Sequence, residues 1–118
     1  RKCDFPLFRS LRTLNLEGNQ IEEFPMFLSK FEKLASLNLA LNKLSNIPNV
    51  HWKGFENLEH LFLNGNKVCE LGGIEGIPRL RVLDLSNNEL KQIPLSLGNC
   101  RNLTSLLIAG NPQRMIRQ

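Results

Sequence analysis

The sequence predicts an α/β fold of the solenoid kind, with a parallel β-sheet on a concave face and short helical turns on the convex face. Three observations predict it. One pattern of apolar residues recurs five times within 118 residues. Each copy holds two apolar residues separated by one position, which is typical of a short strand. Each copy then reaches an asparagine, and the apolar spacing that follows suits helical turns.

The predicted strands follow directly from the copies. The opening leucines lie 22 to 24 residues apart, and they are Leu11, Leu34, Leu58, Leu80 and Leu103. The apolar pairs that follow them are Leu14 and Leu16, Leu37 and Leu39, Leu61 and Leu63, Leu83 and Leu85, and Leu106 and Ile108. One strand cannot bury such a pair alone, so neighbouring copies must stack side by side and share a core.

An asparagine follows each strand at the same position. The five are Asn19, Asn42, Asn66, Asn88 and Asn111. An amide both donates and accepts hydrogen bonds, so it can satisfy backbone groups where the chain turns away from the sheet. We therefore predict a structural ladder of asparagines, and not a ligand site.

The repeated pattern resembles the leucine-rich repeat, and this resemblance covers nearly the whole chain. It implies a curved horseshoe segment. The stretch from Ile93-Pro94 to Asn111-Pro112 resembles the last repeats of an intracellular eukaryotic member of the family, which implies an intracellular binding scaffold. We expect residues 1–118 to form one leucine-rich-repeat domain of about five repeats, cut from a longer array, because neither end shows a full polar cap.

The return path between strands also repeats. An apolar anchor precedes a proline at Phe24-Pro25, Ile47-Pro48 and Ile93-Pro94, where the proline fixes the backbone. Residues six and three positions before the next opening leucine are expected to pack inward from the convex side. They are Leu28 and Phe31, Trp52 and Phe55, Ile74 and Ile77, and Leu97 and Cys100. The third copy carries Gly72-Gly73 in place of the proline, which predicts a tight turn.

The charge distribution argues against a nucleic-acid binder. The net charge of +4 comes from the two ends, while the stretch from Ser10 to Gln113 holds ten basic and ten acidic residues. A nucleic-acid binder needs a concentrated basic face. No apolar run reaches the roughly 18 residues of a spanning helix, so no membrane partner is expected either.

Groups suited to catalysis are few. The histidines are His51 and His60, and no hydrolase, metalloprotease, redox or phosphate-loop motif is present. Cys3, Cys69 and Cys100 are far apart without a CxxC pair, so neither a zinc site nor a disulfide framework is expected. The sequence predicts a protein that is not an enzyme, with no metal and no cofactor.

The candidate partner-binding site lies among the outward strand positions. They form two columns, the first of Thr13, Ser36, His60, Val82 and Ser105, and the second of Asn15, Asn38, Phe62, Asp84 and Leu107. Most are small or polar, but Phe62 and Leu107 are large and apolar. We predict a contact site at Phe62 and Leu107, flanked by His60, Val82, Arg81 and Asp84. The alternative is that Phe62 only covers the sheet.

The favoured function is a protein–protein interaction scaffold that binds a protein partner on the concave face. One alternative is a regulatory subunit that positions a catalytic partner such as a protein phosphatase, suggested by the short third repeat. Another is an extracellular recognition receptor, which the glycosylation sequon at Asn102 permits. We expect a cytoplasmic location, with the nucleus also open, and a monomer unless the uncapped ends associate.

Overall fold

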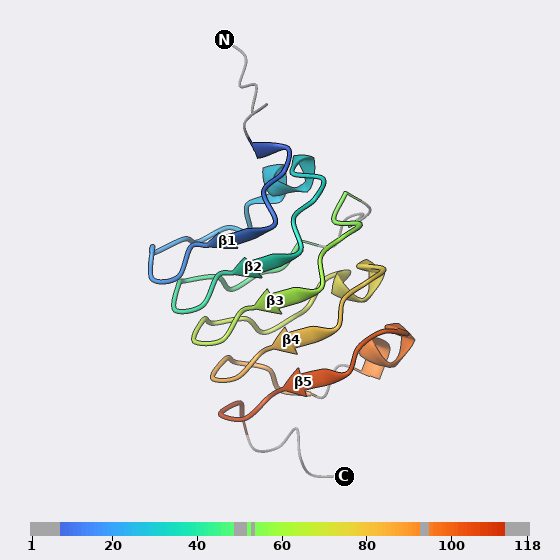
Figure 1. The fold of residues 1–118 in the computed structure, drawn as a ribbon. Helices are drawn as coiled ribbons and strands as arrows, with labels where there is room; N and C mark the ends of the chain where they lie inside the picture. Colours follow the sequence, from blue (N-terminus) through green and yellow to red (C-terminus); the bar gives the residue numbers. More distant parts are fainter. Residues whose placement is uncertain (1–7, 49–51, 53, 93–94, 113–118) are drawn as a thin grey trace.

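Five short strands build one parallel sheet, as the sequence predicts. The computed structural model describes residues 8–48, 52, 54–92 and 95–112. The strands are β1 (Thr13–Asn15), β2 (Ser36–Asn38), β3 (His60–Phe62), β4 (Val82–Asp84) and β5 (Ser105–Leu107). They pair in chain order, β1-β2-β3-β4-β5, and Figure 1 shows them as successive rungs of one stack. The predicted solenoid is confirmed.

The register of the sheet places equivalent positions of every repeat side by side. Leu14 pairs with Leu37, and the match continues through Leu61 and Leu83 to Leu106. No strand is shifted by a residue, because a one-residue slip would turn the leucines to the solvent side. The outward positions therefore form straight columns across five strands.

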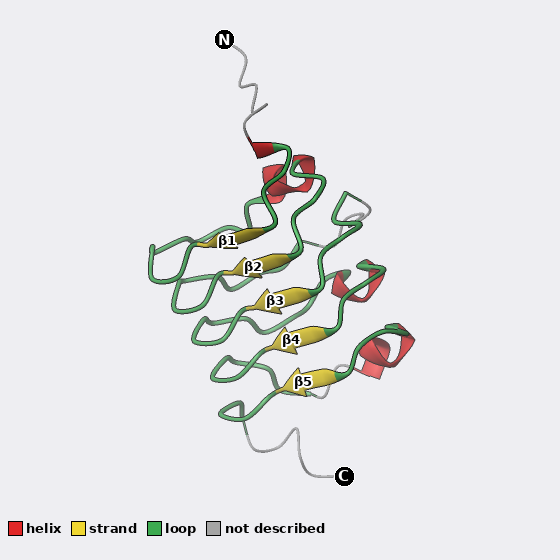
Figure 2. Cartoon of the chain, in the orientation of Figure 1, coloured by secondary structure: helices red, strands yellow, loops and turns green. Residues whose placement is uncertain are grey.

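The helical turns on the return path are 3-10 helices of three to five residues. They are η2 (Met26–Lys30), η3 (Ile74–Gly76) and η4 (Leu95–Asn99). Figure 2 shows them in a row apart from the strands. Each buries one apolar residue in the core, at Leu28, Ile74 and Leu97. Such short runs are typical of 3-10 helices, whose hydrogen-bond geometry is poorer than that of α-helices.

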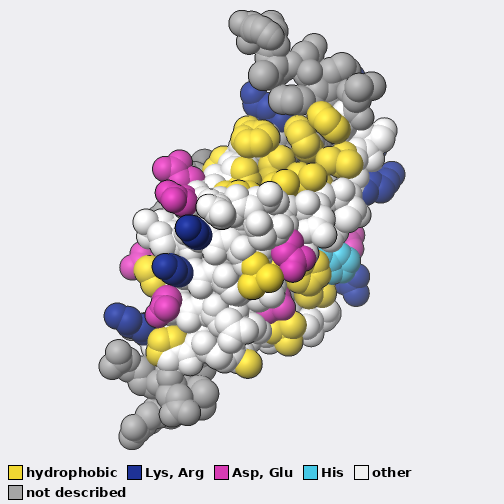
Figure 3. Space-filling model, turned by 90° about the vertical axis from the view of Figure 1, so that its left-hand side faces the viewer, with side chains coloured by type: hydrophobic (Ala, Val, Ile, Leu, Met, Phe, Trp, Pro, Cys, Tyr) yellow, Lys and Arg dark blue, Asp and Glu magenta, His cyan; other side chains and the backbone are white. Residues whose placement is uncertain are grey.

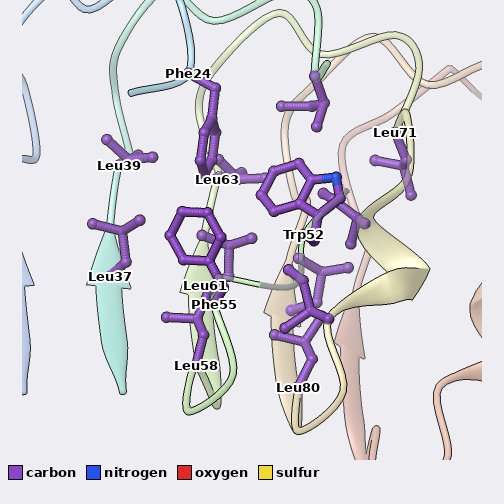
Figure 4. Close-up of a cluster of buried hydrophobic side chains, with 14 of the residues drawn as sticks. Phe24, Leu37, Leu39, Trp52, Phe55, Leu58, Leu61, Leu63, Leu71 and Leu80 are labelled. Carbon is purple, nitrogen blue, oxygen red and sulfur yellow. The ribbon is translucent and has the colours of Figure 1, made fainter. Parts of the chain in front are cut away.

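The core lies between the sheet and the return path. The inward strand residues Leu37, Leu61 and Leu83 are fully buried. An aromatic group fills the space behind β2 and β3, where Trp52 meets Phe24 edge-on with ring centroids 4.9 Å apart and lies 5.4 Å from Phe55 (Figure 4). Trp52 and Phe55 thus occupy the convex-side core, as their spacing predicts. Cys100 lies in the equivalent place in the last repeat and is half-buried.

The third repeat turns at Gly72, as its sequence predicts. Gly72 has φ of +58°, which glycine adopts without strain. A side chain there would also collide with the carbonyl oxygens of Ile47 and Pro48 in the preceding repeat. The anchors Phe24, Ile47 and Leu71 are buried at the start of their return paths. The remaining predicted anchor, Ile93-Pro94, lies outside the described residues.

The two edges of the sheet are less buried than its centre. Leu14 and Leu16 of the first repeat are only half-buried, whereas Leu61 and Leu63 are fully buried. Figure 3 shows hydrophobic side chains gathered at the end of the molecule nearest the N-terminus. Within the described ranges, no helix is long and apolar enough to cross a membrane, and no three potential metal ligands converge.

Candidate protein-binding face

The outward side chains of the sheet stand in the two predicted columns. His60 has Ser36 on one side and Val82 on the other, and Phe62 lies between Asn38 and Asp84. Each of these residues keeps part of its surface in solvent, while the leucine between them on each strand is buried. The sheet therefore holds the side chains of both columns in fixed positions on one open face.

Phe62 is the centre of an apolar and aromatic group on this face. The rings of His60 and Phe62 stack, with centroids 6.4 Å apart and planes 12° from parallel. Val82 lies directly beside His60 on the next strand. His60, Phe62 and Val82 form what we call the concave patch.

Leu107 is the most exposed apolar residue of the second column, with 46% of its surface accessible. Asp84 stands between Phe62 and Leu107 in the strand register. Its Oδ1 accepts a hydrogen bond of 3.0 Å from the backbone N–H of Ser86. The carboxylate is therefore directed toward the end of its own strand, and it separates Leu107 from the concave patch.

The hydrogen bond made by Asp84 belongs to a pattern that Phe62 and Leu107 break. Asn15 Oδ1 accepts from the N–H of Glu17 at 3.0 Å, and Asn38 Oδ1 accepts from the N–H of Ala40 at 2.9 Å. Each acceptor ties a side chain to the backbone two residues on, which stabilises the turn that follows the strand. Phe62 and Leu107 have no acceptor atom. At these two positions the local side-chain hydrogen bond is absent and an apolar side chain faces outward.

Arg81 stands at the rim of the sheet, one residue before β4. Its Nη1 lies 3.6 Å from Glu59 Oε1, and about half of the Arg81 side chain and 39% of the Glu59 side chain are exposed. Arg81 also lines a hollow with Arg79, Arg101 and Asn102. The structure thus groups His60, Phe62, Val82 and Asp84 as the sequence suggests, while Leu107 lies apart and Arg81 belongs to the neighbouring flank.

The five asparagines after the strands form a row that ties repeat to repeat. Asn66 Oδ1 accepts from the N–H of Leu44 at 2.9 Å, and its Nδ2 donates to the carbonyls of Leu39 and Leu63 at 3.0 Å each. Asn42, Asn88 and Asn111 make the same kind of bonds between adjacent repeats. The amide donors and acceptors of these four asparagines bond to the backbone of their own and the neighbouring repeat, which is a structural role.

Asn19 differs because it stands at the open edge. It is exposed, and its Nδ2 donates to the carbonyls of Leu16 and Glu17 within its own repeat. The bond between repeats is instead made by its backbone N–H, which donates to Asn42 Oδ1 at 2.8 Å. The asparagines of the middle repeats are therefore more buried than the one at the edge.

Leu41 is a surface residue that sequence reasoning missed. It precedes the asparagine of the second repeat, where the other repeats have Gly18, Gly65, Asn87 and Gly110. All five positions have positive φ, and Leu41 has +57°. A leucine is strained there, whereas glycine and asparagine are tolerated. Its side chain leans over Gly65 and remains 57% exposed. The Gly/Asn preference of the other four repeats was the signal that could have identified it.

Cys100 packs where the sequence expects an inert residue. Its S–H donates to the carbonyl of Glu75 at 3.7 Å. Burial, and secondly the nearby charge of Glu75, raise the pKa of the Cys100 thiol. A raised pKa leaves less thiolate at neutral pH, so the reactive form is disfavoured. Cys69 is free and exposed. Cys3 and His51 lie outside the described residues.

Two models of a single family match the chain. The model described as "Leucine rich repeat" matches residues 9–68, and the one described as "Leucine Rich repeats (2 copies)" matches residues 78–114. Together they span all five strands.

Similar curated proteins carry the same repeats within much longer chains. An uncharacterized leucine-rich repeat-containing protein of Schizosaccharomyces pombe is 34% identical over 89 residues, which is 75% of this chain and 14% of that protein. Mouse lumican is 39% identical over 98 residues, covering 80% of this chain and 28% of lumican. Mouse CD180 antigen is 34% identical over 113 residues, covering 91% of this chain and 17% of the antigen. The chain therefore spans well under a third of each of these relatives.

Two solved structures resemble the fold. The leucine-rich repeat domain of APL1B has a TM-score of 0.78 at 27% identity, and the match covers 88% of this chain and 33% of that domain. A chain in the Drosophila melanogaster SNF/U2A' complex has a TM-score of 0.71 at 24% identity, with 85% and 59% covered. Both support the same strand-and-turn stack.

Proposed function

The chain belongs to the leucine-rich repeat family, and from that premise we propose that it is a non-catalytic protein-binding module whose partner contacts the concave face. Proteins of this family generally act by binding other proteins. The finer part of the proposal is the place of contact. We assign it to the concave patch of His60, Phe62 and Val82, with Leu107 as a second apolar contact and Asp84 between them.

The observation that carries the proposal is the break in the second column. In three of five repeats this position holds an acceptor that bonds to the following turn, at Asn15, Asn38 and Asp84. Phe62 and Leu107 forgo that bond and expose apolar surface instead. Phe62 is only half-buried and Leu107 is 46% exposed, so both side chains keep apolar surface in solvent. Aromatic and apolar residues on rigid strands are the usual anchors of protein interfaces.

The test compares two phenylalanines that are both accessible. Phe62→Ala removes the centre of the concave patch, and Phe27→Ala removes a side chain that is 57% exposed on η2. Proteins retained by the immobilised chain are identified, and the affinity of each purified protein is measured for both variants. We expect Phe62→Ala to cost about 1–4 kcal/mol of binding and Phe27→Ala to leave affinity unchanged. Equal affinity of Phe62→Ala and wild type would overturn the proposed contact site.

A second candidate is an extracellular recognition receptor, which the exposed sequon residues Asn102 and Thr104 favour. The free thiols of Cys69 and Cys100 favour the reducing cytoplasm or nucleus, and we propose that location. Expression through a secretory pathway followed by mass measurement distinguishes them. A protein that functions in the cytoplasm needs no glycan, so enzymatic removal of any glycan on Asn102 should leave partner binding unaffected. Loss of binding after that removal would favour the receptor.

A further inference from the structure

The flank of the sheet beside the concave patch carries a hollow lined by three arginines. Arg79, Arg81 and Arg101 surround a space of about 400 Å³, with Glu59, Asn102 and Thr104 completing the lining. We call it the arginine hollow. It lies at the start of the strands, between the return path and the sheet, on residues from the third, fourth and fifth repeats.

The positive charge of the arginine hollow is only partly neutralised. Arg81 lies 3.6 Å from Glu59, the single acid in the lining. Arg79 Nη1 donates to the neutral Asn57 Oδ1 at 3.2 Å. Arg101 is exposed and has no ion pair within the described part of the chain. Two guanidinium groups are thus available to an anion, and their planar donor sets fit carboxylates.

A second hollow on the same flank, between the second and third repeats, has the opposite charge. A space of about 440 Å³ is lined there by Glu32 and Glu56 with one cation, Lys33, and by Ser29, Gly54 and Asn57. The two hollows share the flank but differ in the sign of the charge that lines them. The excess of positive charge is therefore particular to the arginine hollow, and it suits a partner that carries negative charge there.

The arginine hollow continues into the concave patch. Arg81 immediately precedes Val82, and Val82 lies beside His60 in the sheet. An extended segment that places an apolar side chain on the patch can reach the hollow with a neighbouring acidic residue. The flank holds too few cations for nucleic acid, since Glu32, Glu56 and Glu59 line the adjoining surface.

From these observations we infer that the arginine hollow binds an acidic segment of the protein partner, through carboxylates paired with Arg79 and Arg101. The inference rests on the proposed protein-binding function and adds the chemistry of the partner. The partner segment is expected to be rich in Asp or Glu next to an apolar residue. This pairing supplies orientation and selectivity, as charges at the rim of an interface do.

A direct test uses a fluorescein-labelled glutamate-rich peptide and the same peptide with glutamine in place of glutamate. The 118-residue chain is titrated against each, and anisotropy is followed. We expect the glutamate peptide to bind and the glutamine peptide not to bind. Replacing Arg79 and Arg101 together by Gln should weaken binding about tenfold or more, since each removes a charge-assisted hydrogen bond.

The control removes the same charge elsewhere. Lys43→Gln with Lys67→Gln changes two exposed cations at the opposite ends of the strands. Equal weakening in both double variants would overturn the inference, because it would show a general charge effect. Tighter binding of a single-stranded oligoribonucleotide through Arg79 and Arg101 would overturn it too. Should the double variant melt early, Arg101→Gln alone is the alternative, because the Arg101 side chain makes no ion pair with the described residues.

The outcome also separates this inference from the proposed function. If Phe62→Ala weakens partner binding and the arginine variants do not, the concave contact stands and the acidic segment is wrong. If the arginine variants abolish peptide binding while Phe62→Ala leaves the partner's affinity unchanged, the hollow stands and the concave contact is wrong.

Discussion

At Phe62 and Leu107 the chain lacks a stabilising side-chain hydrogen bond and exposes an apolar side chain that a partner can contact. The sheet favours Asn or Asp at their position, because the side chain then accepts a hydrogen bond from the turn that follows. A protein selected only for stability would keep the acceptor in every repeat. Surface residues that break a local rule without a structural gain are expected at functional sites.

The missing hydrogen-bond acceptor gives a prediction at Leu107. Leu107→Asn should restore the acceptor and stabilise the protein by about 0.5–1.5 kcal/mol relative to Leu107→Ala, which also removes the leucine but adds no acceptor. Chemical denaturation of both variants measures the difference. Equal unfolding free energies would mean that the hydrogen bond contributes nothing at this position.

Leu41 gives a second prediction at the residue scale. Its backbone has φ of +57°, a region in which a leucine costs about 1 kcal/mol. Asparagine tolerates this conformation and already occupies the equivalent position at Asn87. Leu41→Asn should therefore be more stable than Leu41→Ala, because alanine has no short polar side chain that can hydrogen-bond locally in this conformation. The melting temperatures of the two variants test this prediction. A lower melting temperature for Leu41→Asn than for Leu41→Ala would contradict the claim that the backbone at Leu41 is strained.

At the scale of the element, the repeat is a strand, an asparagine and a short return path. The strand residues were predictable because period-two leucines can point inward in one register only. The return path was predictable in position, since Trp52, Phe55 and Leu97 are buried where their spacing places them. Its helix type was not, because the choice of a 3-10 turn depends on the length of chain available between stacked repeats.

The asparagine row yields a third prediction. Asn66→Ala removes a buried amide and leaves the N–H of Leu44 without its acceptor, at a cost of about 1–3 kcal/mol. The carbonyls of Leu39 and Leu63 lose one donor each and keep those of Asn42 and Asn88. Asn19→Ala is the matched control, since its amide is exposed and bonds within one repeat. Thermal unfolding should show a large loss for Asn66→Ala and a small one for Asn19→Ala. Similar losses would contradict the role assigned to burial.

At the scale of the whole molecule, the stacking of repeats aligns equivalent residues into continuous columns on the surface. Straight columns arise because every strand pairs in the same register, so the identity of each outward residue can be read from the sequence. That is why His60, Phe62, Val82 and Asp84 could be grouped in advance. The arginine hollow could not be. It combines Arg79, Arg81 and Arg101, which lie before the strands and outside the two outward columns that the strand pattern predicts.

The central claim is that a protein partner covers the concave patch. Hydroxyl-radical footprinting read by mass spectrometry tests it in one measurement, by comparing side-chain oxidation in the free chain and in the complex. We predict strong protection of Phe62 and Leu107 with unchanged oxidation of Phe27, which is exposed on the return path. Protection of Phe27 with Phe62 as reactive as in the free chain would contradict the claim.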